Sequence, residues 1–202
     1  MKRPFDLGVA LAGLVMTSPL LVVAAVLVRL DSSGPSFYRG VRVGRDGRPF
    51  HIYKLRTMRD GADVQGPAIT GAGDPRTTAV GRLLRRTKLD EVPQLLNVVR
   101  GEMSLVGPRP EHPEFLKHYT DEQREVLSVR PGITGPGSLA FIEEEEMLSV
   151  GDPVAQYVDT ILPQKLALDL QYVRTASFSG DLKILARTVR LVLGRAIGRS
   201  SR

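Results

Sequence analysis

Two adjacent carboxylates, Asp90 and Glu91, stand between arginines in a pattern that suggests phosphate chemistry. Arg85 precedes them by one to two helical turns, and Arg109 follows inside a stiff Gly-Pro-Arg-Pro turn. A guanidinium group pairs bidentately with phosphate oxygens, and a carboxylate can act as a nucleophile or as a metal ligand. The set therefore predicts a site that binds a phosphorylated substrate and acts on it.

The dipeptide also has a plainer interpretation, because Asp and Glu are common at helix starts, where they complement the macrodipole. Pro93 marks such a start, and Gly101 is suited to end the helix. A short amphipathic helix over residues 80–87 would carry Arg85 on a polar side. Taken alone, the pair fits a helix cap as well as a catalytic group, so the rest of the chain has to decide.

Composition limits the possible functions. The 202 residues suffice for one domain with a sizeable core, and the net charge of +6 favours anionic partners. There is no cysteine, which excludes disulfides and thiolate zinc sites, and the three histidines lack metal-site spacing. Nucleic acid is not an expected partner, because no binding motif is present and aromatic residues make up 5%.

The N-terminal region is long and apolar. No charged side chain occurs from Leu7 to Val28, a stretch of 22 residues that spans about 33 Å as a helix. A cleaved signal peptide is disfavoured, because the stretch is long for one and no good small-residue cleavage site follows. The region is expected to enter a membrane.

Ser18-Pro19 lies near the middle of this stretch and raises a choice of topology. Proline removes a backbone donor and frees the carbonyl four residues back, at Val15, to which Ser18 can offer its hydroxyl. Basic residues flank both ends, which favours placing both in the cytoplasm. A re-entrant hairpin bent at Ser18-Pro19 and a single kinked transmembrane helix both remain open on these grounds.

The region after the apolar stretch is predicted to contain a β-hairpin over 36–58, with alternating residues on each side of a Gly-rich turn. Period 2 places Lys54 and Arg56 on one face, where an ordinary solvated strand is the plain alternative. Residues 60–78 are rich in Gly, Pro, Asp and Thr, and are expected to form a mobile loop.

Helices are expected in the second half of the chain. Residues 120–123 match a capping box, and Asp152-Pro153 and Leu162-Pro163 mark helix starts. The four acids at 143–146 are interpreted as a solvated helix face. The last helix, with an apolar stripe from Leu182 to Ile197 and basic residues beside it, fits either a membrane surface or ordinary core packing.

The chain resembles the bacterial sugar transferases, the small monotopic phosphoglycosyl transferases that begin glycan assembly on a polyprenol carrier. The resemblance covers nearly the whole chain and rests on an ordered set of motifs, which is specific although each motif alone is weak. They are Lys2 to Asp6, Ser18-Pro19, Tyr38 to Gly47, Lys54 to Met58, Asp74 to Arg76, Leu89 to Leu95, Gly101 to Pro110 and Arg130 to Gly135.

The resemblance implies a topology and a fold. It favours the re-entrant helix, with Ser18 and Pro19 at the hairpin apex. The expected fold is α/β, mostly helical with a small β-hairpin: a membrane helix-break-helix over 1–33 and a compact catalytic domain with membrane-surface amphipathic helices over 34–202. The expected location is the cytoplasmic face of the bacterial inner membrane, in monotopic form.

The resemblance also implies a reaction. A sugar 1-phosphate passes from a UDP-sugar to a polyprenol phosphate (undecaprenyl phosphate), with Mg²⁺, release of UMP and ping-pong kinetics. The aspartate of the dyad, here Asp90, becomes phosphorylated, while Arg85 and Arg109 bind phosphate. The other implied partners are the phospholipid membrane and downstream glycosyltransferases.

Further roles are assigned as hypotheses. Asp90 is expected to be ionised at neutral pH, with its pKa lowered by the helix N-terminus and the arginines. Asp90 and Glu91 are the candidate metal ligands, with Glu91 favoured for Mg²⁺. Lys54 or Arg56 is expected to hold the lipid phosphate.

The chain departs from the family pattern in one informative place. Many relatives continue with tryptophan after Ile133-Thr134-Gly135, whereas this chain continues with Pro136-Gly137-Ser138. Because this region is expected to touch the sugar nucleotide, the resemblance does not specify the sugar. Smaller departures are Val92, Glu102 and Leu55.

Overall fold

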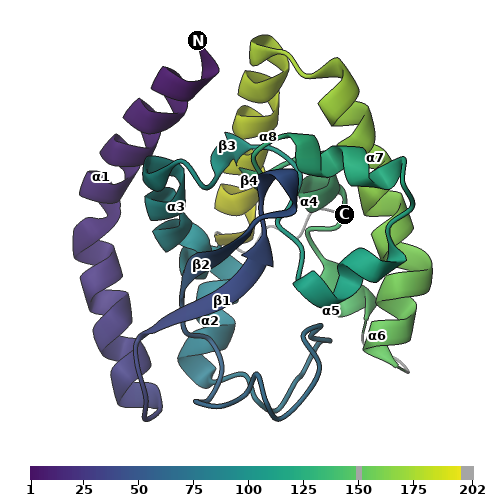
Figure 1. Cartoon of the computed structure of the whole chain (residues 1–202). Coiled ribbons are helices and arrows are strands. Elements are labelled where there is room, and N and C mark those ends of the chain that lie inside the picture. The colour runs from purple at the N-terminus through teal and green to yellow at the C-terminus, as the bar shows by residue number, and fades with distance from the viewer. Residues whose placement is uncertain (149–151, 197–202) are drawn as a thin grey trace.

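A single long helix, α1, runs along one side of a domain in which helices surround two small sheets (Figure 1). The computed structural model describes residues 1–148 and 152–196. The first half of the chain holds α1 (Lys2–Asp31), β1 (Phe37–Val43), β2 (Pro49–Leu55), α2 (Ala79–Thr87), the 3-10 helix η2 (Leu89–Gln94), α3 (Leu95–Arg100) and β3 (Ser104–Val106). The second half holds the 3-10 helices η3 (Pro113–His118) and η4 (Gln123–Ser128), β4 (Gly132–Thr134), α4 (Pro136–Ala140), α5 (Glu144–Met147), α6 (Pro153–Gln156), the π-helical turn Tyr157–Ile161, α7 (Leu162–Thr175) and α8 (Phe178–Ala196).

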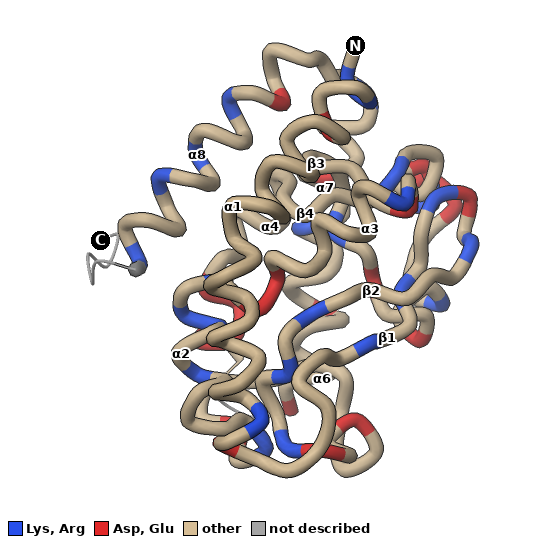
Figure 2. The backbone as a smooth tube through the Cα atoms, turned by 90° about the vertical axis from the view of Figure 1, so that its left-hand side faces the viewer, with Lys and Arg blue, Asp and Glu red and all other residues tan. Residues whose placement is uncertain are grey.

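Helix α1 presents most of its apolar surface outward. Its 30 residues extend about 45 Å, and it is the one helix within residues 1–148 and 152–196 that is long and apolar enough to cross a membrane. Val15 and Met16 are 74% and 81% exposed, whereas Ala10, Ala24 and Val28 are buried against the domain. Figure 2 shows that charged residues gather at the two ends of α1. The outer face of α1 therefore has the composition of a membrane contact.

The helix continues through Ser18-Pro19 without a break. Ser18 donates a hydrogen bond from Oγ to the carbonyl of Val15 at 2.8 Å, as expected, and Thr17 donates to the carbonyl of Gly13 at 2.7 Å. These hydroxyls donate hydrogen bonds to carbonyls near the proline, and helical structure extends across the expected break. Helix α1 is bowed near its middle (Figure 1). The re-entrant hairpin stays a prediction.

Polar contacts dock the start of α1 on the domain. Lys2 pairs with Asp181 of α8 at 2.6 Å, and the buried carboxylate of Asp6 accepts a hydrogen bond from Ser104 of β3 at 2.7 Å. Arg3 donates to the carbonyl of Val98 at 2.6 Å, near the C-terminal end of α3. The Lys2 to Asp6 motif therefore fixes α1 to the elements that surround the dyad.

The predicted hairpin is confirmed. Strands β1 and β2 pair antiparallel from Phe37 with Leu55 to Val43 with Pro49, around a turn at Arg45–Gly47. Residues 60–78 form turns with no helix or strand, as expected for a loop. Arg76 braces this loop through Asp74 at 2.7 Å, and the mobility of the loop stays a prediction.

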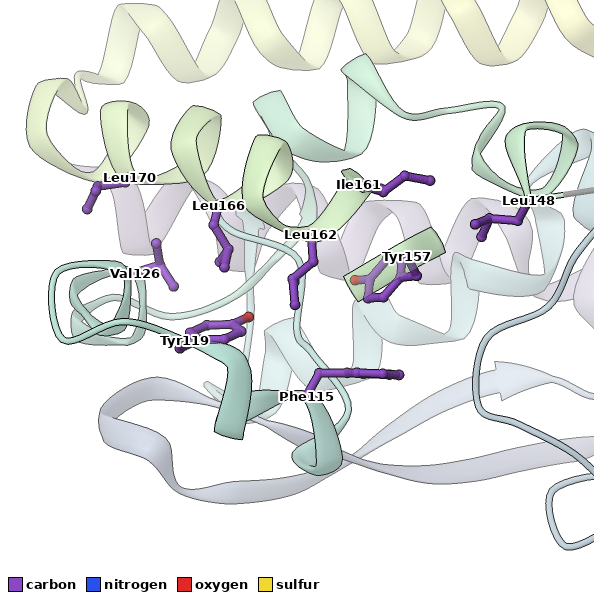
Figure 3. Close-up of a cluster of buried hydrophobic side chains, with 9 residues drawn as sticks. All are labelled: Phe115, Tyr119, Val126, Leu148, Tyr157, Ile161, Leu162, Leu166 and Leu170. Atoms are coloured by element: carbon purple, nitrogen blue, oxygen red, sulfur yellow. The ribbon is translucent and has the colours of Figure 1, made fainter. Parts of the chain in front are cut away.

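Local signals in the second half are also confirmed. Thr120 and Gln123 exchange both hydrogen bonds of a capping box, although the helix that follows is 3-10 rather than α. Asp152 caps α6, and α7 begins at Leu162. Figure 3 shows that α7, η3 and η4 close around one apolar core, which contains Phe115, Tyr119, Val126, Leu148, Tyr157, Ile161, Leu162, Leu166 and Leu170.

The predicted stripe of α8 divides into two faces. Leu185 packs on the core, whereas Leu182, Val189 and Leu193 are 42%, 57% and 55% exposed. Basic residues recur along the same helix in Figure 2. Helix α8 therefore packs one apolar side on the core and exposes another. Ile197, the last residue of the predicted stripe, lies outside the described residues.

Candidate active site

The dyad sits at a sharp change of chain direction. Lys88 ends α2 in the left-handed conformation, with φ 56°, and η2 begins at the next residue. Asp90 and Glu91 follow at once and are 6% and 9% exposed. They occupy a 3-10 turn ahead of α3 rather than the first turn of an α-helix, and Gly101 ends α3 with φ 84°, as predicted. Burial of both carboxylates is more than a surface helix cap requires.

Glu91 is held between two cations. Its Oε1 lies 3.0 Å from Lys54 Nζ and 2.7 Å from Arg109 Nη2. Although burial alone would raise the pKa of Glu91, the charges of Arg109 and Lys54 hold that pKa well below its usual range. Glu91 is therefore an ionised carboxylate whose main contacts are with the protein itself.

Asp90 is in a different state. Its Oδ1 is buried without a hydrogen-bond partner among the described residues. Burial raises the pKa of Asp90, the neighbouring charge of Glu91 raises it further, and the opposing effect of Lys54 and Arg85 is smaller. The expectation that arginines and a helix N-terminus lower this pKa was wrong, because burial and the charge of Glu91 outweigh the lowering effect of the nearby cations Lys54, Lys88 and Arg85. Asp90 therefore carries the free, poorly solvated oxygen of the site.

Arg85 approaches the dyad but is held elsewhere. It donates from Nε to Thr57 Oγ1 at 2.9 Å and from Nη1 to Glu145 Oε1 at 2.8 Å. The interpretation of the acids at 143–146 as a merely solvated face was therefore incomplete, since Glu144 also pairs with Lys165 at 2.6 Å. Sequence spacing offered no signal for these pairs, because their partners lie far away along the chain.

Arg109 is positioned by two sequence motifs that pair with each other. The β3 and β4 segments form a parallel pair, with Ser104 opposite Gly132. Gly107 donates its N–H to the carbonyl of Thr134 at 2.9 Å, and Gly132 donates to the carbonyl of Pro108 at 2.8 Å. A Cβ on Gly132 would lie 2.1 Å from the nitrogen of Gly107, so only glycine permits this approach. The pairing fixes the turn that aims Arg109 at Glu91.

Asp169 anchors the start of α4, where Pro136-Gly137-Ser138 follows β4. Its Oδ1 accepts a hydrogen bond from the N–H of Gly137 at 2.9 Å, and it also interacts with the backbone of Arg109. Burial raises the pKa of Asp169 to about 6. The buried carboxylate of Asp169 on α7 thus holds two segments in place, the start of α4 and the turn that carries Arg109.

Arg56 is not brought to the dyad. It is 5% exposed and donates from Nε to the carbonyl of Pro35 at 2.6 Å and from Nη1 to Ser32 Oγ at 2.9 Å. These contacts fasten the chain that leaves α1 to the end of β2. Of the two residues proposed to hold a lipid phosphate, the structure brings Lys54 to the dyad and gives Arg56 a structural position. The pattern Lys54-Leu55-Arg56 gave no sign of this difference.

The dyad is also the place to test for a metal ion. Within residues 1–148 and 152–196, no group of three or more Asp, Glu, His or Cys side chains is arranged to hold one. Mg²⁺ commonly uses one or two carboxylates together with substrate phosphates, and the unpaired Oδ1 of Asp90 suits that mode. The cations on Glu91 make it the less available ligand, so the geometry favours Asp90 over Glu91.

Comparison with known proteins agrees with these observations. The family model described as bacterial sugar transferase matches residues 1–195. The uncharacterized sugar transferase EpsL of Bacillus subtilis (strain 168) is 42% identical over 193 residues, covering 96% of this chain and 87% of that protein.

Two further relatives carry more specific names. A UDP-glucose:undecaprenyl-phosphate glucose-1-phosphate transferase of Caulobacter vibrioides is 40% identical, covering 95% of this chain and 69% of its own. A UDP-N-acetylgalactosamine-undecaprenyl-phosphate N-acetylgalactosaminephosphotransferase of Aeromonas hydrophila is 35% identical, covering 95% of this chain and 43% of its own. With the dyad, the paired motifs and a family match over nearly the whole length, this chain belongs to the bacterial sugar transferase family.

Proposed function

We propose that this chain transfers a sugar 1-phosphate from a UDP-sugar to undecaprenyl phosphate, with release of UMP. The relatives named for this reaction support the substrate classes. The observation that carries the proposal is the unpaired, buried Oδ1 of Asp90 beside a glutamate that two cations hold. This arrangement leaves one oxygen of Asp90 available for attack, while Lys54 and Arg109 offset the charge of Glu91.

In the proposed first step, Asp90 attacks the β-phosphorus of the UDP-sugar. An Asp90 oxygen–phosphorus bond forms, the bond between that phosphorus and the bridging oxygen breaks, and UMP leaves with that oxygen. In the second step, an oxygen of undecaprenyl phosphate attacks the same phosphorus, and Asp90 leaves as a carboxylate. The product is an undecaprenyl diphosphate sugar, which a glycosyltransferase can extend during exopolysaccharide assembly.

The surrounding residues prepare Asp90 for attack. Burial removes water from the carboxylate, and a carboxylate with a raised pKa is a stronger nucleophile once it has lost its proton. Arg109 and Arg85 are the side chains proposed to contact phosphate oxygens, where fixed positive charge stabilises the transition state. A Mg²⁺ ion held by Asp90 and substrate phosphates would supply further charge stabilisation when bound.

The site must accept a soluble nucleotide sugar and a lipid phosphate in turn. The outward apolar faces of α1 and α8 support membrane association, and we propose that the protein lies on the cytoplasmic face of the inner membrane. The re-entrant topology is tested with single cysteines at Met1 and Ser33. Labelling of both by an impermeant reagent from the same side supports the hairpin; labelling from opposite sides identifies a transmembrane span.

The reaction is tested directly by UMP release. Purified protein in nanodiscs with undecaprenyl phosphate is offered a panel of UDP-sugars, including UDP-glucose and UDP-N-acetylgalactosamine. One sugar should support UMP release and formation of a lipid-linked product, and Asp90→Asn should abolish both. Turnover by Asp90→Asn close to wild type would remove Asp90 from the role of nucleophile.

A further inference from the structure

The β1–β2 hairpin presents one face to the dyad, and that face holds a second cation. In the antiparallel register Tyr38 lies opposite Lys54, and Arg42 lies opposite Phe50. Directly opposed side chains share a face, and so do residues two apart along a strand. Tyr38 and Arg42 therefore lie on the same face as Lys54, whose Nζ contacts Glu91 at 3.0 Å.

The end of β1 also adjoins the turn that carries Arg109. Val43, the residue after Arg42, donates its backbone N–H to the carbonyl of Glu111 at 2.9 Å. Burial lowers the pKa of the Arg42 guanidinium, the charge of Glu111 opposes that effect, and the charge of Arg109 adds to it. Arg42 thus belongs to the cationic cluster around the dyad, although it enters from a different element.

Arg42 differs from its neighbours in lacking an acidic partner. Lys54 and Arg109 pair with Glu91, whereas Arg42 makes no ion pair within residues 1–148 and 152–196, and its guanidinium donates to the carbonyl of Val41 at 2.8 Å. Nearby Glu111 accepts a hydrogen bond from Tyr157 instead. Partial burial of an unpaired cation is unfavourable unless an anion completes its surroundings.

Gly40, which lies between Tyr38 and Arg42 on this face, leaves space for the Tyr38 ring. A Cβ at Gly40 would lie 2.6 Å from Cε1 and 2.7 Å from the hydroxyl oxygen of Tyr38. The Tyr38 ring therefore lies over Gly40 along the hairpin face, toward Arg42, which explains why a glycine interrupts the strand here.

We propose that Arg42 binds a phosphate group of a substrate and extends the anion site of the dyad along the hairpin face. This inference rests on the proposed function. The phosphate comes from either the UDP-sugar or the undecaprenyl phosphate, both of which offer the same oxygen chemistry to a guanidinium.

The test compares Arg42→Ala and Arg42→Lys with wild type in nanodiscs. The matched control is Arg39→Ala, which removes an exposed arginine from the opposite face of the same strand, where it stacks on Tyr53. Thermal midpoints confirm that each variant is folded. KM is measured for the UDP-sugar and for undecaprenyl phosphate separately, and UDP binding to each resting protein is measured by calorimetry.

Loss of an arginine–phosphate contact should raise one KM by about 10- to 100-fold, with Arg42→Lys between Arg42→Ala and wild type. A raised KM for the UDP-sugar with weaker UDP binding assigns the nucleotide phosphate, and a raised KM for undecaprenyl phosphate with unchanged UDP binding assigns the lipid phosphate. Both KM values within twofold of wild type, or an equal effect of Arg39→Ala, would overturn the assignment. If wild type releases no UMP with any sugar, the proposed function fails, and binding of UDP and undecaprenyl phosphate to wild type and Arg42→Ala then decides the role of Arg42.

Discussion

The Nη2 atom of Arg109 lies 2.7 Å from Oε1 of Glu91, so the Gly-Pro-Arg-Pro turn is fastened to the dyad by a partly buried ion pair. Lys54 reaches the same oxygen from β2. Glu91 therefore joins η2, β2 and the turn that carries Arg109. Its charge holds Lys54 and Arg109 in position before a substrate phosphate binds. This arrangement gives the two carboxylates of the dyad separate tasks and leads to the following predictions.

Glu91→Gln should destabilise the fold. It leaves Lys54 and Arg109 without a charged partner in a buried site, and breaking such a pair costs about 3 kcal/mol. Thermal unfolding in nanodiscs measures the loss. The control is Glu122→Gln, which removes an exposed partner of Arg174 and should cost less than about 0.5 kcal/mol. Equal midpoints for the two variants would contradict the bracing role of Glu91.

Asp90→Asn should abolish turnover and stabilise the protein at neutral pH. Because the pKa of Asp90 is raised in the folded state, folding binds its proton more tightly, and stability falls as pH rises through that pKa. The neutral amide removes this cost. The thermal midpoint of Asp90→Asn should exceed that of wild type at pH 8, and the gap should shrink as the pH is lowered. An unchanged gap between pH 8 and pH 4 would contradict the raised pKa of Asp90.

The first chemical step should be sensitive to acid. Asp90 attacks as a carboxylate, so kcat/KM for the UDP-sugar should fall about tenfold per pH unit below its pKa. Since that pKa is raised, the fall should begin at a higher pH than an ordinary aspartate, with pKa 3.8, would give. UMP release in a single turnover, followed from pH 8 to pH 3, checks this. A midpoint at or below 3.8 would contradict the raised pKa of Asp90.

Arg56→Ala should affect stability rather than substrate binding. The variant loses hydrogen bonds to the carbonyl of Pro35 and to Ser32, and each buried bond to a charged group is worth about 1.5–3 kcal/mol. The thermal midpoint should fall, while KM for undecaprenyl phosphate stays within twofold of wild type. Lys54→Met is the comparison, because Lys54 touches Glu91 and its loss should reduce kcat. A large rise in KM for the Arg56 variant would restore its expected role with the lipid.

Ser18 and Pro19 should be energetically coupled. Ser18→Ala removes the donor that bonds the Val15 carbonyl, at a cost of about 1 kcal/mol. Pro19→Ala supplies a backbone N–H to the same carbonyl, so Ser18→Ala should be nearly neutral in the Pro19→Ala background. A double-mutant cycle of thermal midpoints in nanodiscs measures this coupling. Additive effects would show that the hydroxyl is not replacing the missing donor.

The sequence by itself determined the elements whose signals are local. Alternation around a glycine turn gave the hairpin, Gly101 ended α3, and Thr120 with Gln123 closed a capping box. Such features depend on residues a few positions apart, so the chain order contains the required information. The ordered motifs likewise identified the family, and the family match over residues 1–195 confirms that identification.

The tertiary structure decided which charges are paired. Lys54 and Arg56 are two positions apart, yet one reaches Glu91 and the other binds the segment after α1. Glu91 is paired while Asp90 keeps a free oxygen, and burial together with the charge of Glu91 reverses the expected direction of the Asp90 pKa. A pKa and an ion pair depend on burial and on partners that are 37 and 18 positions away from Glu91. Only folding brings those groups within reach and removes the water between them.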